Sequence, residues 1–307
     1  MINSKKSGIL ARREMIEGYL FISPWIIGFI VFIAGPLCAS LILSFCEWGF
    51  LSPPKLIGTK NYINLFEKDP LFLQSLRVTL RYVLISIPLG TVGSLLLAIL
   101  MNQKLKCISL FRTAYYLPAV VSGVAIALVW MWVFNADFGI LNYLLGKLGI
   151  VGPRWLFSRT WGLPALIIIN VWKLMPSNMV IYLVGLQSIP EHFYEAAEID
   201  GANWWVKFWK ITLPLITPII FFNLVMNLIV SFQMFTEAYV MTGGGPANAT
   251  LSYGLYLYRV AFEYFDMGYA CALAWVLFAI ILLCTLLVFK SSPFWVYYEA
   301  EVRGYKQ

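Results

Sequence analysis

Four side chains in two apolar stretches of this 307-residue chain could bind a hydroxyl-rich ligand. Asn223 and Asn227 are four residues apart in one stretch and therefore share one face of a helix. Trp172 and Lys173 lie near the middle of the other stretch. Because amides bond hydroxyl groups and an indole ring stacks on a sugar ring, these residue types suit a sugar. Structural roles stay open: the amides can join helices, and Lys173 can pair with Glu237 or with a carbonyl.

Other residue types with chemical potential lack the spacing that chemistry needs. The one Gly-Lys pair, Gly146-Lys147, is followed by Leu148, so the chain has no phosphate-binding loop ending in Gly-Lys-Ser/Thr. The five cysteines show no metal-ligand spacing, and the single histidine, His192, lies in a polar connection. We therefore expect no catalytic residue, no metal site and no cofactor.

The composition places the chain in a membrane. Hydrophobic residues make up 61% of it and charged residues 12%, which is about half the share of a soluble domain. A soluble domain of this length could not bury so much apolar surface, so lipid must be part of its solvent. The net charge of +7 comes without a basic patch that has interleaved stacking residues, and nucleic acid is therefore not an expected partner.

The apolar windows predict an all-α, polytopic membrane protein with six transmembrane helices. A spanning helix needs about 20 apolar residues. Six windows meet this length, at about residues 19–46, 82–103, 113–136, 161–189, 211–235 and 267–289. The first follows basic residues but is too long for a signal peptide, so we interpret it as an uncleaved span.

Basic residues predict that both termini are cytoplasmic. They gather before the first window, in the second connection and near the C-terminus: Lys5, Lys6, Arg12, Arg13, Lys104, Lys106, Arg112, Lys290, Arg303 and Lys306. Lysines in the first external loop weaken this pattern. The prediction places loops 47–77, 137–160 and 237–266 outside.

The polar connection between the fourth and fifth windows predicts a helical hairpin. Ser188 and Glu191 have the spacing of a capping box, and Pro190 tolerates an early helix position. A short helix would then carry Glu195, and Gly201 would allow a turn or a close approach. An amphipathic piece, residues 204–210, leads into the fifth window.

The spacing in this connection resembles the EAA loop of permease subunits in bacterial ABC importers. The matching residues are Glu195-Ala196-Ala197, then Gly201, then Ile211-x-Leu213-Pro214. Further segments resemble the sugar branch of that family, with permeases similar to those for maltose, other oligosaccharides and glycerol-3-phosphate. These segments are residues 110–118 (LFRTAYYLP), 138–142 (FGILN) and 242–246 (TGGGP).

The resemblance implies a type I ABC importer fold in the bacterial cytoplasmic membrane. Residues 1–17 would form a cytoplasmic segment, 18–290 the six-span permease domain, 188–214 its cytoplasmic coupling loop and 291–307 a cytoplasmic tail. The coupling residues would be Glu195, Ala196, Ala197, Asp200, Gly201, Ala202, Ile211, Leu213 and Pro214. In that family the substrate cavity lies near the membrane midplane and uses this part of the fifth span.

The resemblance also implies the partners. They are an ATPase dimer, a homologous sister permease in a heterodimer, an extracytoplasmic solute-binding protein, a sugar or oligosaccharide, and membrane lipid. Two other classes stay open: an ion-coupled secondary carrier, and a polytopic membrane enzyme. A carrier could show inverted repeats, of which none is convincing, and an enzyme would need a paired base within the spans.

Overall fold

The computed structural model describes residues 4–49, 51–103 and 106–297. The expected basic residues Lys104, Arg303 and Lys306 lie outside the described residues. The described chain is mostly helical, and it divides into two compact units.

Unit 1 comprises the chain up to residue 68 together with residues 260–276. Its helices and strands are α1 (Ser4–Phe29), η1 (Ile30–Ala34), α2 (Gly35–Leu43), β1 (Cys46–Glu47), β2 (Lys55–Leu56), α3 (Lys60–Glu67), most of η5 (Arg259–Glu263) and the first part of α13 (Met267–Ser291). The antiparallel pair β1 and β2 is held to α3 by Asn61, whose Nδ2 donates to the carbonyls of Ser44 and Cys46, both at 2.9 Å.

Unit 2 comprises residues 69–259 and the chain from residue 277 onward. Its helices are α4 (Pro70–Met101), α5 (Ile108–Val120), α6 (Gly123–Val133), α7 (Ile140–Lys147), η2 (Trp155–Phe157), α8 (Gly162–Ser188), α9 (His192–Ile199), α10 (Trp204–Lys207), η3 (Phe208–Thr212), α11 (Leu213–Phe232), η4 (Ala238–Thr242), α12 (Tyr253–Tyr258), the rest of α13 and η6 (Ser292–Phe294).

The described residues contain five helices that are long and apolar enough to cross a membrane, and a sixth if one bent pair counts as a span. This agrees with the six predicted windows. The five are residues 11–43, 70–101, 162–188, 204–232 and 267–294, and the bent pair is α5 with α6.

The second span begins earlier than the sequence predicted. Residues 70–77 were expected in the external loop, but α4 starts at Pro70. The Asp69 carboxylate caps it by accepting from the backbone N–H of Leu71 at 2.9 Å and of Phe72 at 3.2 Å, and Pro70 occupies the first turn. The apolar pattern did not predict this start, because the charged residues Arg77 and Arg81 lie inside the helix and interrupt the apolar window.

The third window is not one straight helix. α5 and α6 meet at an angle of 101° across Val121 and Ser122, whose ψ angles of 141° and 136° are not helical. Pro118 lies in the last turn of α5, where it cannot donate a helical hydrogen bond. The apolar pattern reveals the length of such a segment but not its bend.

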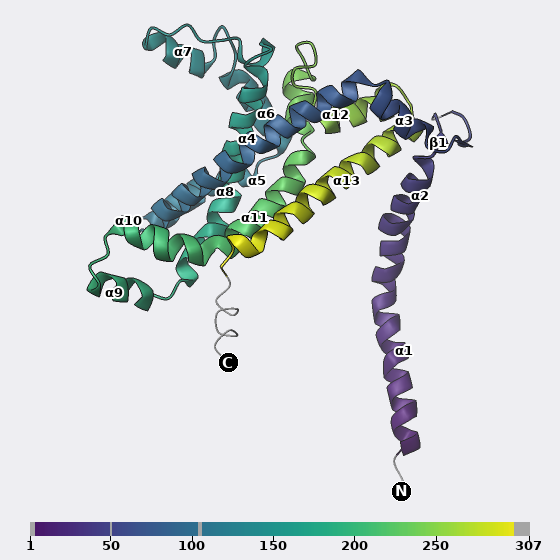
Figure 1. Cartoon of the computed structure of the whole chain (residues 1–307), viewed down its shortest axis with the longest axis horizontal. Coiled ribbons are helices and arrows are strands. Elements are labelled where there is room, and N and C mark those ends of the chain that lie inside the picture. Colours follow the sequence, from purple (N-terminus) through teal and green to yellow (C-terminus); the bar gives the residue numbers. More distant parts are fainter. Residues whose placement is uncertain (1–3, 50, 104–105, 298–307) are drawn as a thin grey trace. The chain divides into compact units, whose positions relative to one another are not determined.

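The core of unit 2 is formed by α4, α8 and α11, with α4 packed along α8 and α11 against both. Tyr182 and Ile216 are fully buried in this core. A Cβ on Gly185 of α8 would lie 2.1 Å from Cδ1 of Ile219, so the absent side chain lets α11 approach. Figure 1 shows α9 and α10 beside the end of α4, with α7 at the opposite end of this unit.

Candidate functional site

The connection between α8 and α11 starts differently from the prediction. Ser188 is the last residue of α8, and its Oγ donates to the Gly185 carbonyl at 2.8 Å. The expected capping box with Glu191 is therefore wrong: Glu191 precedes α9 without a side-chain cap. Ile189 is extended, because the residue before a proline is pushed away from the helical region. Pro190 thus ends the long helix before it permits the short one.

Gly201 ends α9 in the conformation for which a glycine is needed. Its φ is +76°, in the left-handed region. The Ala202 N–H donates to the Ala197 carbonyl at 2.8 Å, and the Gly201 N–H donates to the Glu198 carbonyl at 3.0 Å. This is the Schellman termination of a helix. Among the described residues, no other group lies within 4 Å of a Cβ built on Gly201, so the turn requires glycine for its backbone and not for space.

The second half of the connection is a helix that continues into the fifth span. Asn203 caps it, with Oδ1 accepting from the Val206 N–H at 2.9 Å, a signal that the sequence reading missed. The helix widens into a π turn at η3 just before Pro214. Because proline lacks an N–H and crowds the carbonyl four residues earlier, it favours such a widened turn.

Two side-chain contacts tie α9 to the start of this helix. Lys207 Nζ donates to Glu198 Oε1 at 2.7 Å, and the Tyr194 and Thr212 hydroxyls lie 3.0 Å apart. Thr212 is buried, whereas the Glu198 side chain is 63% exposed. One hydroxyl pair and one ion pair therefore connect α9 to the helix that follows the Gly201 turn. Because that helix continues into the fifth span, α9 is attached to the span by these two contacts.

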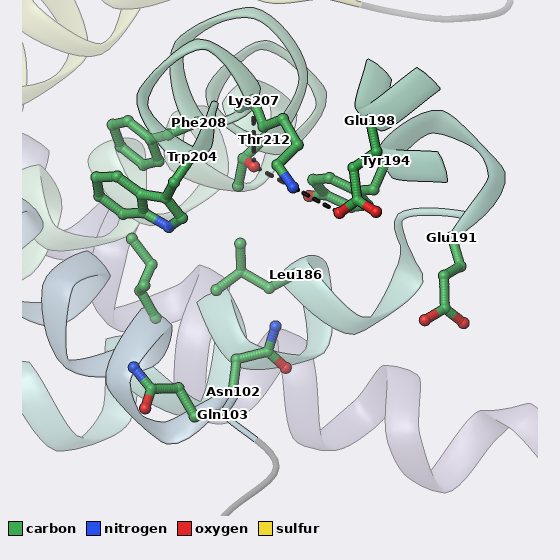
Figure 2. A pocket seen from close by; sticks show the side chains of 11 residues that line it. Asn102, Gln103, Leu186, Glu191, Tyr194, Glu198, Trp204, Lys207, Phe208 and Thr212 are labelled. Carbon is green, nitrogen blue, oxygen red and sulfur yellow. Dashed lines mark hydrogen bonds and ion pairs between the residues drawn. The ribbon is translucent and has the colours of Figure 1, made fainter. Parts of the chain in front are cut away.

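A groove of about 350 Å³ lies between these contacts and the ends of α4 and α8. Figure 2 shows Lys207 extending towards Glu198 across it, with Glu191 standing apart from the pair. The groove is lined by Ile99, Asn102, Gln103, Leu186, Glu191, Tyr194, Glu198, Trp204, Lys207, Phe208 and Thr212.

The residues predicted to couple separate into an exposed set and a packed set. Glu195, Ala196, Asp200 and Gly201 are exposed, while Ala197, Ala202, Ile211, Leu213 and Pro214 are half-buried. Leu213 packs against the core of unit 2. The sequence reading missed Ile199, which is 88% exposed between acidic neighbours. An exposed isoleucine in a polar loop was the signal that could have identified it.

The ion pair considered for Lys173 is present. Its Nζ donates to Glu237 Oε1 at 2.8 Å, and the Glu237 side chain is only 8% exposed while that of Lys173 is 40% exposed. Trp172 meets Trp130 of α6 edge to face, with ring centroids 5.4 Å apart. Both rings line a largely apolar cavity of about 290 Å³ along α5 and α6.

Asn223 and Asn227 occupy a different environment. They are buried in α11, with exposed fractions of 1% and 6%, and neither lines the cavity next to Trp172. Among the described residues, no acceptor meets hydrogen-bond geometry with either Nδ2, although the Asn223 side chain lies against the Tyr182 hydroxyl. The structure thus leaves Trp172 and Lys173 partly open and encloses the two amides.

Comparisons with known proteins agree with this architecture. Residues 90–293 match the family described as binding-protein-dependent transport system inner membrane component. A probable ABC transporter permease, YesP of Bacillus subtilis strain 168, is 46% identical over 94% of each chain. The lactose transport system permease LacF of Rhizobium radiobacter is 35% identical, over 92% of this chain and 96% of that protein.

The fold is also that of a solved transporter. A chain of the bacterial alginate ABC transporter, determined in complex with alginate pentasaccharide-bound periplasmic protein, superposes with a TM-score of 0.80 at 24% identity, covering 92% of this chain and 95% of that one. This chain belongs to the family of binding-protein-dependent transport system inner membrane components. It is an ABC transporter permease with several membrane-spanning helices.

Proposed function

We propose that this permease passes a sugar or oligosaccharide across the cytoplasmic membrane after receiving it from an extracytoplasmic solute-binding protein. The observation that carries the proposal is the α9 turn, in which a small acidic surface is held on the start of the fifth span. The names of this permease's relatives, which include a lactose transport system permease, support the substrate class. Energy comes from a separate ATPase dimer, because this chain has no phosphate-binding loop.

Transport in liposomes tests the proposal. The permease is reconstituted with its sister permease and ATPase, with ATP inside and the binding protein outside. Oligosaccharide uptake is expected only when both ATP and the binding protein are present. Uptake that follows an ion gradient without ATP would instead identify an ion-coupled carrier and overturn the proposal.

The ATPase docks on the exposed face of α9 in this proposal. Glu195 and Asp200 offer carboxylates to basic groups, Ala196 leaves room for close approach, and Ile199 provides an apolar anchor. Ile211, Leu213 and Pro214 serve the packing of the fifth span instead. Docking would therefore move the fifth span through Glu198, Lys207, Tyr194 and Thr212.

The docking proposal requires residues 188–214 and both termini to be cytoplasmic, with residues 1–17 and 291–307 on the same side. A cysteine in place of Asn248 should react with a membrane-impermeant reagent added outside, whereas one in place of Asn203 should not. Labelling of the Asn203 position alone would reverse the orientation and remove the docking role.

We place Trp172 and Lys173 in the substrate pathway ahead of Asn223 and Asn227, because the first pair is partly open and the second is enclosed. Asn227→Ala should leave uptake and sugar preference unchanged. The stability of the complex should change little, because no described residue accepts a hydrogen bond from its Nδ2 and no such bond is lost with the amide. Impaired uptake with unchanged stability would return Asn227 to the pathway, and Trp172→Ala provides the comparison that should impair uptake.

A further inference from the structure

The helix that contains the fifth span is longer than a membrane crossing requires. It runs from Trp204 to Phe232 over 29 residues, which corresponds to about 43 Å at 1.5 Å per residue. The hydrocarbon core is about 30 Å thick, and about 20 residues cross it. The 20 residues of α11 meet that need, so α10 and η3 extend into the headgroup region or beyond it.

One face of this extension is aromatic and basic. Trp205 and Trp209 are 59% and 51% exposed, one turn apart, with ring centroids separated by 5.8 Å. Val206 and Lys210 are exposed beside them. Lys207 points the other way, into the groove, where Glu198 neutralises it. Lys210 has no ion pair with any described residue.

We propose that this face, formed by Trp205, Val206, Trp209 and Lys210, binds anionic phospholipid in the cytoplasmic leaflet. Tryptophan favours the boundary between headgroups and acyl chains because its ring is apolar and its N–H is polar. A lysine at that depth extends its ammonium group towards lipid phosphates. The cytoplasmic side follows from the proposed orientation of the loop.

Continuity with a spanning helix favours lipid over a protein as the occupant. In this proposal the 20 residues of α11 cross the hydrocarbon core, and at 1.5 Å per residue Lys210 and Trp209 then lie about 5 Å and 6 Å beyond its edge, at headgroup depth. The surface proposed for the ATPase, on α9, has the opposite charge. Through Tyr194 and Thr212, the lipid contact would hold α9 at a set depth, which makes the face a membrane anchor for the coupling helix.

The first test measures depth without relying on transport. A single cysteine replaces Val206 in a variant whose five native cysteines are substituted, and a nitroxide is attached in the assembled complex in nanodiscs. The ratio of collisions with oxygen to collisions with a water-soluble nickel chelate should be clearly higher for this label than for a label in place of Ile199. A Val206 label inaccessible to both reagents would reveal a protein partner, and a ratio equal to that at Ile199 would reveal water. Either result overturns the proposal.

The second test addresses the anionic lipid. Complexes in discs of phosphatidylcholine mixed with phosphatidylglycerol are released and weighed by native mass spectrometry. Lys210→Gln should lower the bound phosphatidylglycerol about fivefold, the effect expected for one basic residue near an anionic surface. Lys147→Gln, a matched change on α7, should leave it unchanged. Equal retention in both variants would remove the lysine from the lipid site.

Discussion

The two halves of the loop between α8 and α11 differ in every property that selects a partner. α9 exposes small and acidic residues with one isoleucine, and it ends at a left-handed glycine. The segment from Trp204 to Thr212 exposes tryptophan and lysine and continues into a spanning helix. The difference shows that sequence proximity does not imply a shared surface. One half suits a basic protein surface, and the other suits a lipid headgroup region.

The largest effect is expected where the two halves meet. Gly201→Trp should abolish uptake while the chain still inserts, because the left-handed backbone disfavours a side chain and its bulk would occupy the space before the docking partner. Gly146→Trp on α7 is the control, since Gly146 is equally open but has no positive φ. Uptake assays and membrane fractions measure both variants.

A smaller substitution sharpens this test. Gly201→Ala should cost about 1 kcal/mol of local stability, whereas Gly201→Asn should cost less because asparagine tolerates the left-handed region. Normal uptake by the Gly201→Trp variant would contradict the coupling role of the turn.

The next effect concerns the charge of α9. Glu195→Lys should weaken attachment of the ATPase by roughly fivefold at low salt, since an attractive carboxylate becomes a repulsive ammonium group. Lys210→Glu, the opposite change in the other half, should leave ATPase affinity unaffected. Affinity measured by co-sedimentation of membranes with the ATPase at two salt concentrations separates them. If both changes weakened ATPase binding equally, the ATPase would contact both halves of the loop, and the separation into two surfaces would be wrong.

A third effect concerns the contacts that join the halves. Replacing Tyr194 with Phe or Thr212 with Val removes one partner of a hydroxyl pair whose Thr212 side is buried, at a cost of about 1 kcal/mol. We expect less sugar transported per ATP hydrolysed, with ATPase attachment retained. If the double variant loses as much as the sum of the single variants, the two hydroxyls do not act as a pair.

The smallest effect is expected at the ion pair between Lys207 and Glu198. Glu198→Gln should lower stability by about 0.5 kcal/mol or less, because the Glu198 carboxylate is largely exposed and solvent screens the pair. Thermal unfolding of the permease without the ATPase, in low and high salt, measures it, with Glu195→Gln as the matched control on the same helix. A loss that is independent of salt would mean that packing, and not charge, joins α9 to α10.

Some parts of the site could be predicted because local physics determines them. The turn at Gly201 follows from the conformational freedom of glycine. The docking role of the residues around Glu195 stays a prediction. Glu237, the observed partner of Lys173, was one of the two partners that the sequence analysis considered, the other being a backbone carbonyl. The capping role expected of Ser188 was wrong, since the long apolar helix continued through it until Pro190 intervened.

The sequence alone determined the membrane class, the approximate positions of six spans and the family resemblance. These depend on apolar length and on short motifs, which are local properties. Only the tertiary structure decided that α5 and α6 bend, that Asn223 and Asn227 are enclosed, and that Tyr194 meets Thr212. Those features depend on which helix faces pack together, and the cost of burying a side chain depends on neighbours that are distant in the chain.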